Sequence, residues 1–384
     1  MHVTHVITTL VAGGTERMLQ RIIASTRASG VEHRVISLTD GGEVADELRH
    51  AGIPVTSLAM RRAGSWPDLM AIGRLASLLR AEPPDIVQAW MYHANVLAGI
   101  AAPLAGRGRA VWSIRAASLP SGRERARTIL LARVAAALAG GLARGVLVNG
   151  ERARVTHIAA GYPSDKMHVI PNGYDLSIWH PDDDARRAVR AELGLGPDAH
   201  IVGMIANFRP IKDHPTFLRA MRAVRRVMPH THILLAGVGT DLDAPEMRRL
   251  VESELGSLAG LSVLGSRRDV PRLTAALDVS VLSSIDESFP NVIAEAMASG
   301  VPVVSTDVGD VRTMLGSAED VVPVGDSAEL ATRVVWWLRQ PRRQREIAGI
   351  LLRHRIADSY SLGAVAAQYV RYWRALADGA TSSR

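Results

Sequence analysis

The sequence predicts two α/β domains, each built on a doubly wound parallel sheet. The length of 384 residues exceeds the usual size of one domain. Short β-branched runs alternate with Ala-, Leu- and Arg-rich segments of helical spacing along the whole chain. Such alternation is typical of βα units, whose parallel sheets carry helices on both faces. The pattern is interrupted between residues 171 and 181, which separates the two domains.

The strands follow from the β-branched runs, and the helices from apolar residues at helical spacing, such as Met18, Ile22 and Ile23. In the first half of the chain we predict strands at 2–9, 34–38, 55–58, 85–90, 110–114, 145–148 and 168–170. In the second half we predict strands at 201–205, 232–236, 262–264, 279–282, 303–305 and 321–322.

The interruption begins PNGYDLSIWHPDDD and is rich in turn formers and aspartate. We therefore place the domain boundary there, with one domain over residues 1–175 and a second over residues 176–358. Helical spacing returns near residue 359 with four aromatic residues: Tyr360, Tyr369, Tyr372 and Trp373. We expect this last helix, residues 359–380, to cross back and pack on the first domain.

The composition is that of a globular protein, with 47% hydrophobic and 22% charged residues. The absence of Cys excludes disulfides, thiolate metal sites and cysteine nucleophiles. The net charge of +7 favours an anionic partner, but aromatic residues make up only 4% and do not interleave with basic ones, so nucleic acid is not the expected partner. Only Lys166 and Lys212 among 45 basic residues are Lys, a bias typical of GC-rich genomes.

No segment has the pattern of a secretory signal or a spanning helix. The N-terminal MHVTHVITTL lacks a basic region and a small-residue cleavage site. The most apolar stretch, residues 129–148, contains Arg133, Arg144 and three glycines. We therefore expect a cytoplasmic protein. A second hypothesis is peripheral contact with the anionic inner face of the membrane through the basic amphipathic segment 121–142; the alternative is a core-facing helix with a solvated Arg face.

Gly13 and Gly14 directly follow the first predicted strand. Glycines allow a close backbone approach, and the helix that follows presents free N–H groups to an anion. The dinucleotide fingerprint is not matched, because its other glycines are missing. A plain tight turn is the alternative interpretation.

Arg209 and Lys212 lie in the loop that follows the first strand of the second half. An Arg fork and a Lys point charge in such a strand-to-helix loop can clamp a diphosphate. Two solvated loop charges are the alternative.

The strongest pattern is a polar loop that runs from a strand into a helix at residues 286–297. Glu287 lies in the loop, and Glu295 lies about a turn into the helix. Carboxylates at the mouth of a sheet can accept hydrogen bonds from sugar or ribose hydroxyls, and the helix N-terminus offers amides to phosphate oxygens. The alternative is a capping loop with a solvated Glu, but Glu295 has apolar neighbours, where an unpartnered carboxylate is costly.

Six motifs in order are similar to those of one family: GGTERM, VIPNGYD, ANFRPIKDHPTFLRA, LLAGVG, VLGSRRDVPRLTAALDVSVLSS and ESFPNVIAEAMASGVPVVSTDVGD. The chain resembles the retaining, nucleotide-sugar-dependent glycosyltransferases of family four (group 1), over nearly its whole length. WMYHAN and the IR of VWSIR are similar to enzymes that build surface polysaccharides and related glycoconjugates. The resemblance implies the GT-B fold, with an acceptor-binding domain at 1–175 and a donor-binding domain at 176–358 facing a cleft.

The resemblance also implies roles in the donor domain. Glu287 would contact the hydroxyls of the donor sugar, and Glu295 would hold the ribose hydroxyls. Arg209 and Lys212 would stabilise the leaving diphosphate. The loop between the two carboxylates would complete the donor site: Ser288, Phe289, Pro290 and Asn291. Residues 267–270 would lie near the base.

In the first domain, Gly13 and Gly14 would approach the phosphate and the acceptor, and His93 and Arg115 would border the transferred sugar. Many members of the family have His where Arg115 stands, so a histidine role is lost there.

Two departures concern the donor domain. The family often has Arg where Asn207 stands, and we expect Arg209 to substitute for it. After VGD a Glu is common, whereas this chain has Arg312-Thr313.

The implied function is transfer of a sugar from a nucleotide-diphosphate sugar, a UDP-sugar above all, to a hydroxyl of a glycan, lipid-linked or small-molecule acceptor. Configuration would be retained, and neither a cofactor nor a metal is expected, since fixed positive charge offsets the charge that develops on the diphosphate. The acidic run at 182–184 is better explained by helix entry than by a metal site. A nucleotide-sugar epimerase or phosphorylase of the same fold stays an alternative, as does a basic nucleic-acid-binding protein.

Overall fold

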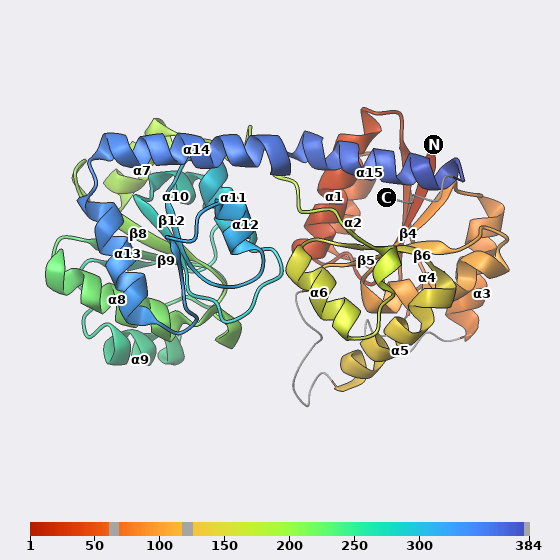
Figure 1. The fold of residues 1–384 in the computed structure, drawn as a ribbon, viewed down its shortest axis with the longest axis horizontal. Coiled ribbons are helices and arrows are strands. Elements are labelled where there is room, and N and C mark those ends of the chain that lie inside the picture. The colour runs from red at the N-terminus through yellow and green to blue at the C-terminus, as the bar shows by residue number, and fades with distance from the viewer. Residues whose placement is uncertain (61–68, 117–125, 380–384) are drawn as a thin grey trace. The chain divides into compact units, whose positions relative to one another are not determined.

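The computed structural model describes residues 1–60, 69–116 and 126–379, and the chain divides into two compact units (Figure 1). Unit 1 contains Met1–Gly173 and Leu362–Arg384, and unit 2 contains Tyr174–Ser361. The chain therefore passes between the units twice, once after Gly173 and once after Ser361.

Unit 1 is built on a parallel sheet that has seven strands in the described part of the chain. Across the sheet they are β3 (Val55–Ser57), β2 (Glu32–Ser37), β1 (His2–Ile7), β4 (Ile86–Trp90), β5 (Ala110–Ile114), β6 (Ala143–Val148) and β7 (Met167–Val169). The order reverses between β1 and β4, so the loops that follow these two strands border the ligand crevice of a doubly wound sheet.

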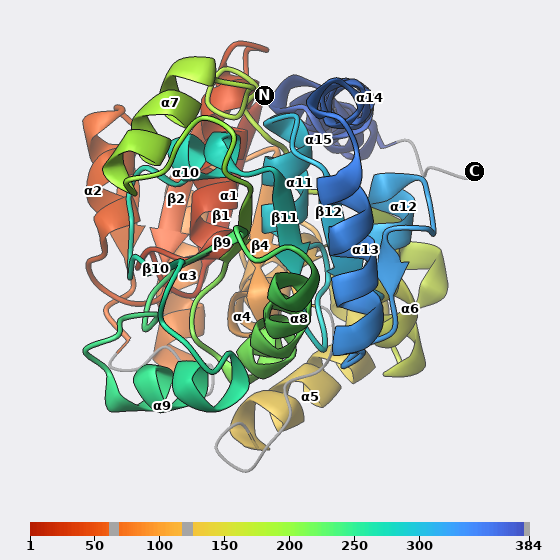
Figure 2. The same ribbon diagram turned by 90° about the vertical axis from the view of Figure 1, so that its left-hand side faces the viewer.

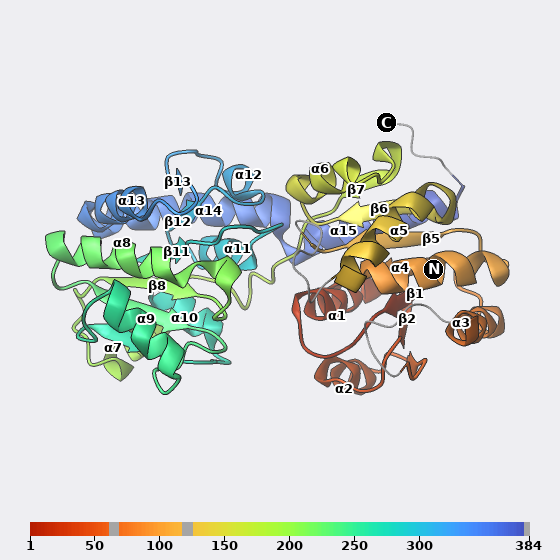
Figure 3. The ribbon, with the colours of Figure 1, turned by 90° about the horizontal axis from the view of Figure 1, so that it is seen from below.

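Helices cover both faces of this sheet, as buried β-branched strands require. One face packs on α1 (Gly14–Arg27), α2 (Glu43–His50) and α15 (Leu362–Ala377). The other packs on α3 (Leu69–Ala81), α4 (Met91–Leu104), α5 (Ala126–Leu142) and α6 (Glu151–Ala159). Helix α4 lies between α3 and α5 (Figure 3). The C-terminal α15 packs on α1 and β4, which confirms that the last helix returns to the first domain.

Unit 2 contains a parallel sheet with six strands among the described residues. Across the sheet they are β10 (Leu261–Val263), β9 (His232–Ala236), β8 (Ile201–Ile205), β11 (Val279–Leu282), β12 (Val303–Thr306) and β13 (Val321–Val322). The order reverses between β8 and β11. The prediction of two doubly wound sheets is confirmed, and each predicted strand lies within two residues of an observed one.

Helices also cover both faces of the unit 2 sheet. One face packs on α8 (His214–Val227), α9 (Pro245–Glu254) and α13 (Ser327–Arg339), of which α8 and α13 lie side by side (Figure 2). The other packs on α7 (Asp183–Glu192), α10 (Val270–Ala276), α11 (Asn291–Ala298), α12 (Val311–Leu315) and α14 (Arg342–Tyr360). Two separate cores, one on each face, therefore hold the strand ends of this unit in place.

The segment proposed for membrane contact falls mainly on α5. Residues 121–125 of that segment lie outside the described residues. In α5, Leu131 and Ala135 are buried in the core of unit 1 and Leu138 packs against it, while Leu130 and Arg133 are exposed. The apolar face is thus used by the core, which favours the core-facing interpretation. Within the described parts of the chain, the structure contains no helix with the length and apolarity needed to cross a membrane.

A chain of buried polar groups crosses the α1 face of the unit 1 sheet. Trp90 Nε1 donates to His5 Nδ1 at 3.2 Å, His5 Nε2 lies 3.0 Å from His33 Nδ1, and His33 Nε2 lies 2.8 Å from Thr26 Oγ1. Thr26 Oγ1 in turn donates to the Ile22 carbonyl at 2.6 Å. Because an indole N–H can only donate, each group in the chain donates to the next, which leaves both imidazoles neutral.

We expect these histidines to make stability depend on pH. Burial, with the charges of His33 and His2, holds the pKa of His5 well below its usual value, and burial, with the charge of Arg27, lowers the pKa of His33 to about 4. The unfolded chain binds protons near pH 6.5, so stability is present above that pH and falls as the pH drops towards 4. The lowered pKa of His33 alone should reduce the free energy of unfolding by about 2 kcal/mol between pH 7.5 and pH 5.

Urea unfolding at pH 5, 6 and 7.5 measures this loss. The variant His33→Asn should flatten the profile, whereas His50→Gln, at an exposed position, should keep the wild-type slope. A wild-type midpoint that does not fall from pH 7.5 to pH 5 would contradict the neutral pair.

Candidate functional site

The strand order of unit 2 brings two polar loops together where it reverses. One loop follows β8 and contains the short helix η3 (Pro210–Lys212); the other follows β11 and leads into α11. Ser283 Oγ lies 2.9 Å from the Lys212 carbonyl oxygen and 3.0 Å from that of Asp213, and its one proton is shared between them. Ile285 N donates to Ile211 O at 2.9 Å. The two loops are therefore held as one surface at the carboxyl ends of the strands, where ligands bind to such sheets.

A cavity of about 310 Å³ opens at this surface. Its lining comes from the loops after β8, β9, β10 and β11 and from the first turns of α11. The lining residues that matter most for its chemistry are Asn207, Lys212, Gly237, Glu287, Asn291 and Glu295. Positive charge, carboxylates and a helix N-terminus thus meet in one hollow.

Lys212 and Glu287 form the polar centre of the cavity. Nζ of Lys212 pairs with Oε1 of Glu287, and Ser284 Oγ donates to the same carboxylate oxygen at 2.9 Å. The two side chains are only 23% and 16% exposed, so charges here act more strongly than on the surface. Because an ammonium carries three N–H donors, Lys212 can keep Glu287 and still donate to an incoming anion.

The N-terminus of α11 forms another wall of the cavity. Phe289 is 5% exposed, Pro290 precedes the helix, and Asn291 is its first residue. Glu295 lies about one turn further, is half-buried and lines the cavity. Ser288 is also buried but lies outside the cavity lining. The first-turn N–H groups of such a helix attract phosphate or hydroxyl oxygens.

Two glycines shape the walls of this cavity by close backbone contacts. Gly237 follows β9 with φ +151°, and a Cβ there would lie 2.1 Å from the Ala206 carbonyl oxygen. Gly309 follows β12 with φ +53°, and a Cβ there would lie 2.5 Å from the Ser288 carbonyl oxygen and 2.8 Å from that of Glu287. Only glycine fits these positions, so both loops can press against their neighbours and hold the cavity walls.

Asn207 takes part in the wall near Gly237, while Arg209 does not. Asn207 Oδ1 accepts a hydrogen bond from Val238 N at 3.0 Å, which ties the loop after β8 to the loop after β9. Arg209 is exposed and lies outside the described lining of the cavity, three residues before Lys212. The structure thus groups Lys212 with the two glutamates and leaves Arg209 exposed, outside the cavity lining.

The loop at 267–270 also contributes to this cavity. Arg267 lines it and forms a two-point pair with Asp269, through Nε to Oδ1 and Nη2 to Oδ2, both at 2.7 Å. The hydrogen bond from Arg267 is the main cause that lowers the pKa of Asp269. Arg272 and Glu192 extend the network. The Arg267 guanidinium is thus held rigid by carboxylates.

In unit 1, Gly13, Gly14 and His93 lie after β1 and β4, where that sheet also reverses. Gly13 precedes α1 as its N-cap, and a Cβ at Gly14 would meet no described atom within 4 Å. His93 lies in the first turn of α4. Met91 begins α4 with φ +70°, a strained conformation for a residue with a side chain, and such strain clusters at functional sites.

Arg115 follows β5 and is engaged within unit 1. Its Nη1 donates to Asn172 Oδ1 at 2.8 Å, and its Nη2 donates to the Tyr369 hydroxyl. The guanidinium carbon lies 5.4 Å from the centre of the Trp90 ring. Arg115 therefore joins the segment that leaves unit 1 to the α15 helix that returns to it.

Two family models match the chain, one in each half. The model described as Glycosyltransferase Family 4 matches residues 12–178, and the model described as Glycosyl transferases group 1 matches residues 199–340. The chain belongs to this family of glycosyltransferases. The second match contains the whole cavity of unit 2.

Similar proteins include D-inositol 3-phosphate glycosyltransferases. The one from Segniliparus rotundus is 29% identical over 62% of this chain and 51% of that protein, and the one from Thermomonospora curvata is 31% identical over 56% and 53%. The chain thus spans about half the length of the curated relatives it matches.

Solved structures of other proteins share the fold. HepE from Anabaena, solved with UDP, has a TM-score of 0.83 at 22% identity and covers 98% of this chain and 100% of that one. Sucrose-phosphate synthase from Thermosynechococcus elongatus has a TM-score of 0.76 at 18% identity, with 99% and 100% covered. At such identities the likeness shows that the two-sheet GT-B fold is shared.

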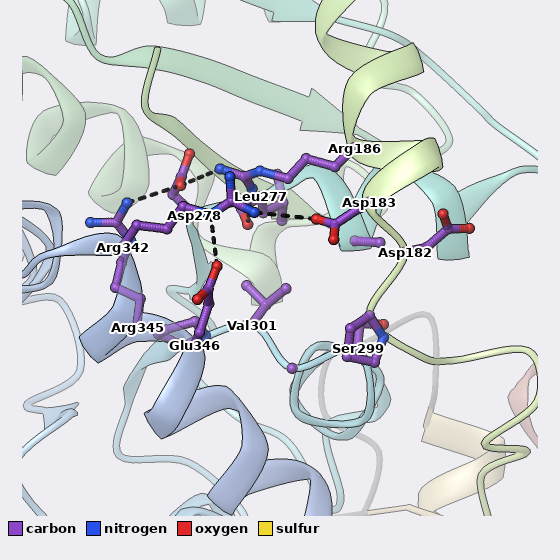
Figure 4. Close-up of a pocket in the computed structure, with 14 residues that line it drawn as sticks. Asp182, Asp183, Arg186, Leu277, Asp278, Ser299, Val301, Arg342, Arg345 and Glu346 are labelled. Atoms are coloured by element: carbon purple, nitrogen blue, oxygen red, sulfur yellow. Dashed lines mark hydrogen bonds and ion pairs between the residues drawn. The ribbon is translucent and has the colours of Figure 1, made fainter. Parts of the chain in front are cut away.

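A second, smaller cavity of about 100 Å³ lies at the opposite, amino ends of the unit 2 strands (Figure 4). There Asp278, 3% exposed, accepts from Arg186 at 2.6 Å, Arg190 at 2.7 Å and Arg345 at 3.3 Å. Ile201 N donates to the same carboxylate at 2.9 Å. Burial alone would raise the pKa of Asp278, but Arg186, the amide and Arg190 hold it below its usual value. This cluster joins α7, β8, β11 and α14. Its role is therefore to stabilise the fold of unit 2.

The acidic run 182–184 at the start of α7 is explained by helix entry, as expected. Asp182 Oδ1 accepts from Ala185 N at 2.8 Å, which caps the first turn of α7. Asp183 pairs with Arg342 at 3.2 Å, and Asp184 pairs with Arg187. Negative charge is favourable at a helix N-terminus, which accounts for the run.

Sequence reasoning missed Ser284 and the cavity position of Asn207. Ser284 is the last residue of VSVLSS, at the carboxyl end of β11, where polar residues of a doubly wound sheet face the ligand crevice. That position was the signal that could have found it. Asn207 was recognised only as a departure from the family, and its bond to Val238 depends on the loop after a neighbouring strand.

Proposed function

We propose that the protein transfers a glycosyl group from a nucleotide-diphosphate sugar, with a UDP-sugar as the expected donor, to an acceptor hydroxyl with retention of configuration. Unit 2 would bind the donor, and unit 1 would bind a glycan, a lipid-linked or a small-molecule acceptor. The observation that carries the proposal is the cavity in which Lys212, Glu287, Glu295 and the N-terminus of α11 meet. Family membership supports the same reaction class.

The leaving diphosphate develops negative charge as the bond to the sugar breaks. We propose that the Lys212 ammonium and the first-turn amides of α11 bind this charge, and that Arg209 adds to it from the rim of the cavity. Such fixed donors are worth more in a shielded site than in water and need no metal ion. The 23% exposure of Lys212 is compatible with this role, since the ammonium is reachable but largely shielded.

The two glutamates would hold hydroxyl groups of the donor. Lys212 and Ser284 both bind Oε1 of Glu287, so the other carboxylate oxygen would accept from the sugar. Glu295, deeper along α11, would accept from the ribose hydroxyls. Charged acceptors in half-buried positions form the stronger kind of hydrogen bond, which fixes the sugar relative to the diphosphate.

The nature of the donor is supported by solved relatives. HepE has been solved with UDP and with UDP-glucose, and we extend UDP-glucose to this chain as the expected donor. On the side of unit 1, Gly13 and Gly14 would approach the phosphate and the acceptor. His93 and Arg115 would border the transferred sugar.

Retention follows if attack occurs on the face that the diphosphate leaves. The bond between the anomeric carbon and the phosphate oxygen breaks, and a bond from that carbon to the acceptor oxygen forms on the same face. The departing phosphate oxygen takes the proton of the acceptor hydroxyl, so no separate base is needed. A product of inverted configuration, read from its anomeric NMR coupling, would contradict this step.

We expect one nucleotide to raise the thermal midpoint of the protein selectively. UDP, GDP, ADP and dTDP are compared with and without magnesium. A ligand at 100 times its dissociation constant stabilises the native state by about 2.7 kcal/mol, which corresponds to roughly 5–10 °C for a unit of this size. UDP should give this rise, and magnesium should not change it.

Matched variants locate the binding site. Glu295→Ala should lose the response to UDP, whereas Glu254→Ala, on α9, should keep it. No rise with any nucleotide, or a rise that depends on magnesium, would contradict the donor site as proposed. Recovery of an altered nucleotide sugar without transfer would point instead to an epimerase.

A further inference from the structure

The two points where the chain passes between the units lie against each other. Tyr174 N donates to Tyr360 O at 2.9 Å, and Tyr174 pairs with Ser361 in a parallel bridge. Within unit 1, a Cβ on Gly173 would lie 3.1 Å from the Leu362 Cα, so the neighbouring residues also touch there. The outgoing and returning segments therefore pair side by side through a parallel β-bridge. We call this pair of segments the crossing (residues 173–174 and 361–362, with Tyr360).

The crossing is packed directly onto the loop of the donor cavity. Tyr174 is fully buried, and its ring stacks on Phe289 with centroids 6.4 Å apart and planes at 20°. The Tyr360 ring also packs on Phe289, with centroids 5.3 Å apart and planes at 55°. Phe289 belongs to the loop that leads into α11, so one aromatic side chain of that loop is held by both segments of the crossing.

A hydrogen bond joins the crossing to the cavity wall itself. The Tyr174 hydroxyl donates to Asn291 Oδ1 at 2.6 Å, and Asn291 is both the first residue of α11 and a lining residue of the cavity. This bond sets the orientation of the amide at the helix N-terminus, where the diphosphate is proposed to bind. Protein interiors are close-packed and contain few voids. A shift of residues 289–291 must therefore be accompanied by a shift of the buried Tyr174.

We propose that Tyr174 is a positioning residue for the donor and links occupancy of the donor cavity to the backbone of the crossing. Through its hydroxyl it orients Asn291, and through its ring it carries movement of Phe289 to both chain segments. The inference rests on the proposed function, since it needs a diphosphate at the N-terminus of α11. It adds to that function a set of contacts, from Asn291 and Phe289 to Tyr174, through which donor binding changes the backbone of the crossing.

The test compares the wild type with Tyr174→Phe, using UDP as the probe. The variant keeps the ring and loses only the hydroxyl, so its dissociation constant for UDP should rise by about 2- to 10-fold, the worth of one hydrogen bond. Hydrogen exchange is followed in peptides that cover residues 171–176 and 358–363. UDP should slow exchange there in the wild type. This response should be smaller in Tyr174→Phe at saturating UDP, because the bond to Asn291 is lost while the ring contact with Phe289 stays.

Tyr372→Phe is the matched control, because it removes a buried tyrosine hydroxyl from α15 of unit 1. It should bind UDP as the wild type does and keep the exchange response. A wild type that binds UDP without any change at the crossing, or a Tyr174→Phe protein that responds fully, overturns the inference and leaves the proposed function standing. A wild type that does not bind UDP overturns the proposed function, and the inference falls with it.

Discussion

Replacing Lys212 by methionine is expected to slow the release of UDP from UDP-glucose by about 10²- to 10³-fold, or roughly 3–4 kcal/mol of transition-state stabilisation. Methionine keeps the unbranched stem of the side chain and removes the charge that would meet the leaving diphosphate. Glu287 loses its ammonium partner but keeps the hydrogen bond from Ser284. The loop after β11 should therefore stay in place. Steady-state turnover with UDP-glucose, in the presence and absence of an acceptor, measures the effect.

The chain supplies a matched control in its other lysine. Lys166 donates to the Gly140 carbonyl at 2.6 Å and to the Ala143 carbonyl at 2.9 Å in unit 1. Lys166→Met should leave turnover within a few-fold of the wild type. Near-normal turnover in Lys212→Met would remove the account of how the leaving group is stabilised, whatever the effect on UDP affinity.

Asp278→Asn is expected to destabilise unit 2 by about 3–5 kcal/mol, because it leaves buried charges without their counter-charge. Three guanidinium groups, those of Arg186, Arg190 and Arg345, converge on this one carboxylate. The Asn side chain has the same shape but can neither neutralise them nor accept equally strong hydrogen bonds. Urea unfolding followed by circular dichroism at pH 7 measures the change.

An exposed ion pair of the same unit provides the comparison. Asp307 pairs with Arg312 at 2.8 Å, with both side chains about half exposed. Asp307→Asn should leave the unfolding midpoint unchanged, since solvent screens exposed pairs. An Asp278→Asn protein as stable as the wild type would contradict this prediction. It would show that the three arginines can regain water and that the cluster does not stabilise unit 2.

Most of the fold could be predicted because its signals are local. A parallel strand buried on both faces must be a short β-branched run, and the helices that cover it must carry apolar residues on one side. Strands 110–114, 201–205, 232–236 and 279–282 were predicted with the observed bounds for this reason. The exceptions are strand ends, such as β6, which begins two residues earlier at Ala143 because pairing with β5 extends it.

The candidate site could be predicted only in part. Glu287, Glu295 and Lys212 were recognised from their positions after strands and in a helix, and the structure brings them into one cavity. Arg209 has the same kind of position, yet it is exposed and lies outside the cavity lining. This could not be predicted, because a sequence does not show which way a loop side chain turns. Arg115 was assigned beside the sugar by resemblance, and its contacts with Asn172 and Tyr369 could not be foreseen.

The residues alone thus establish the βα alternation, the division into two sheets and the family, since each depends on neighbours in the chain. Which side chains contact each other in the site depends on the strand order, and only the folded chain reveals that order. Lys212 meets Glu287 and Tyr174 meets Asn291 because β8 lies beside β11 and because the crossing packs on the loop before α11. Parallel strands collect their carboxyl ends at one edge regardless of separation in sequence, and so the chemistry of the site belongs to the tertiary structure.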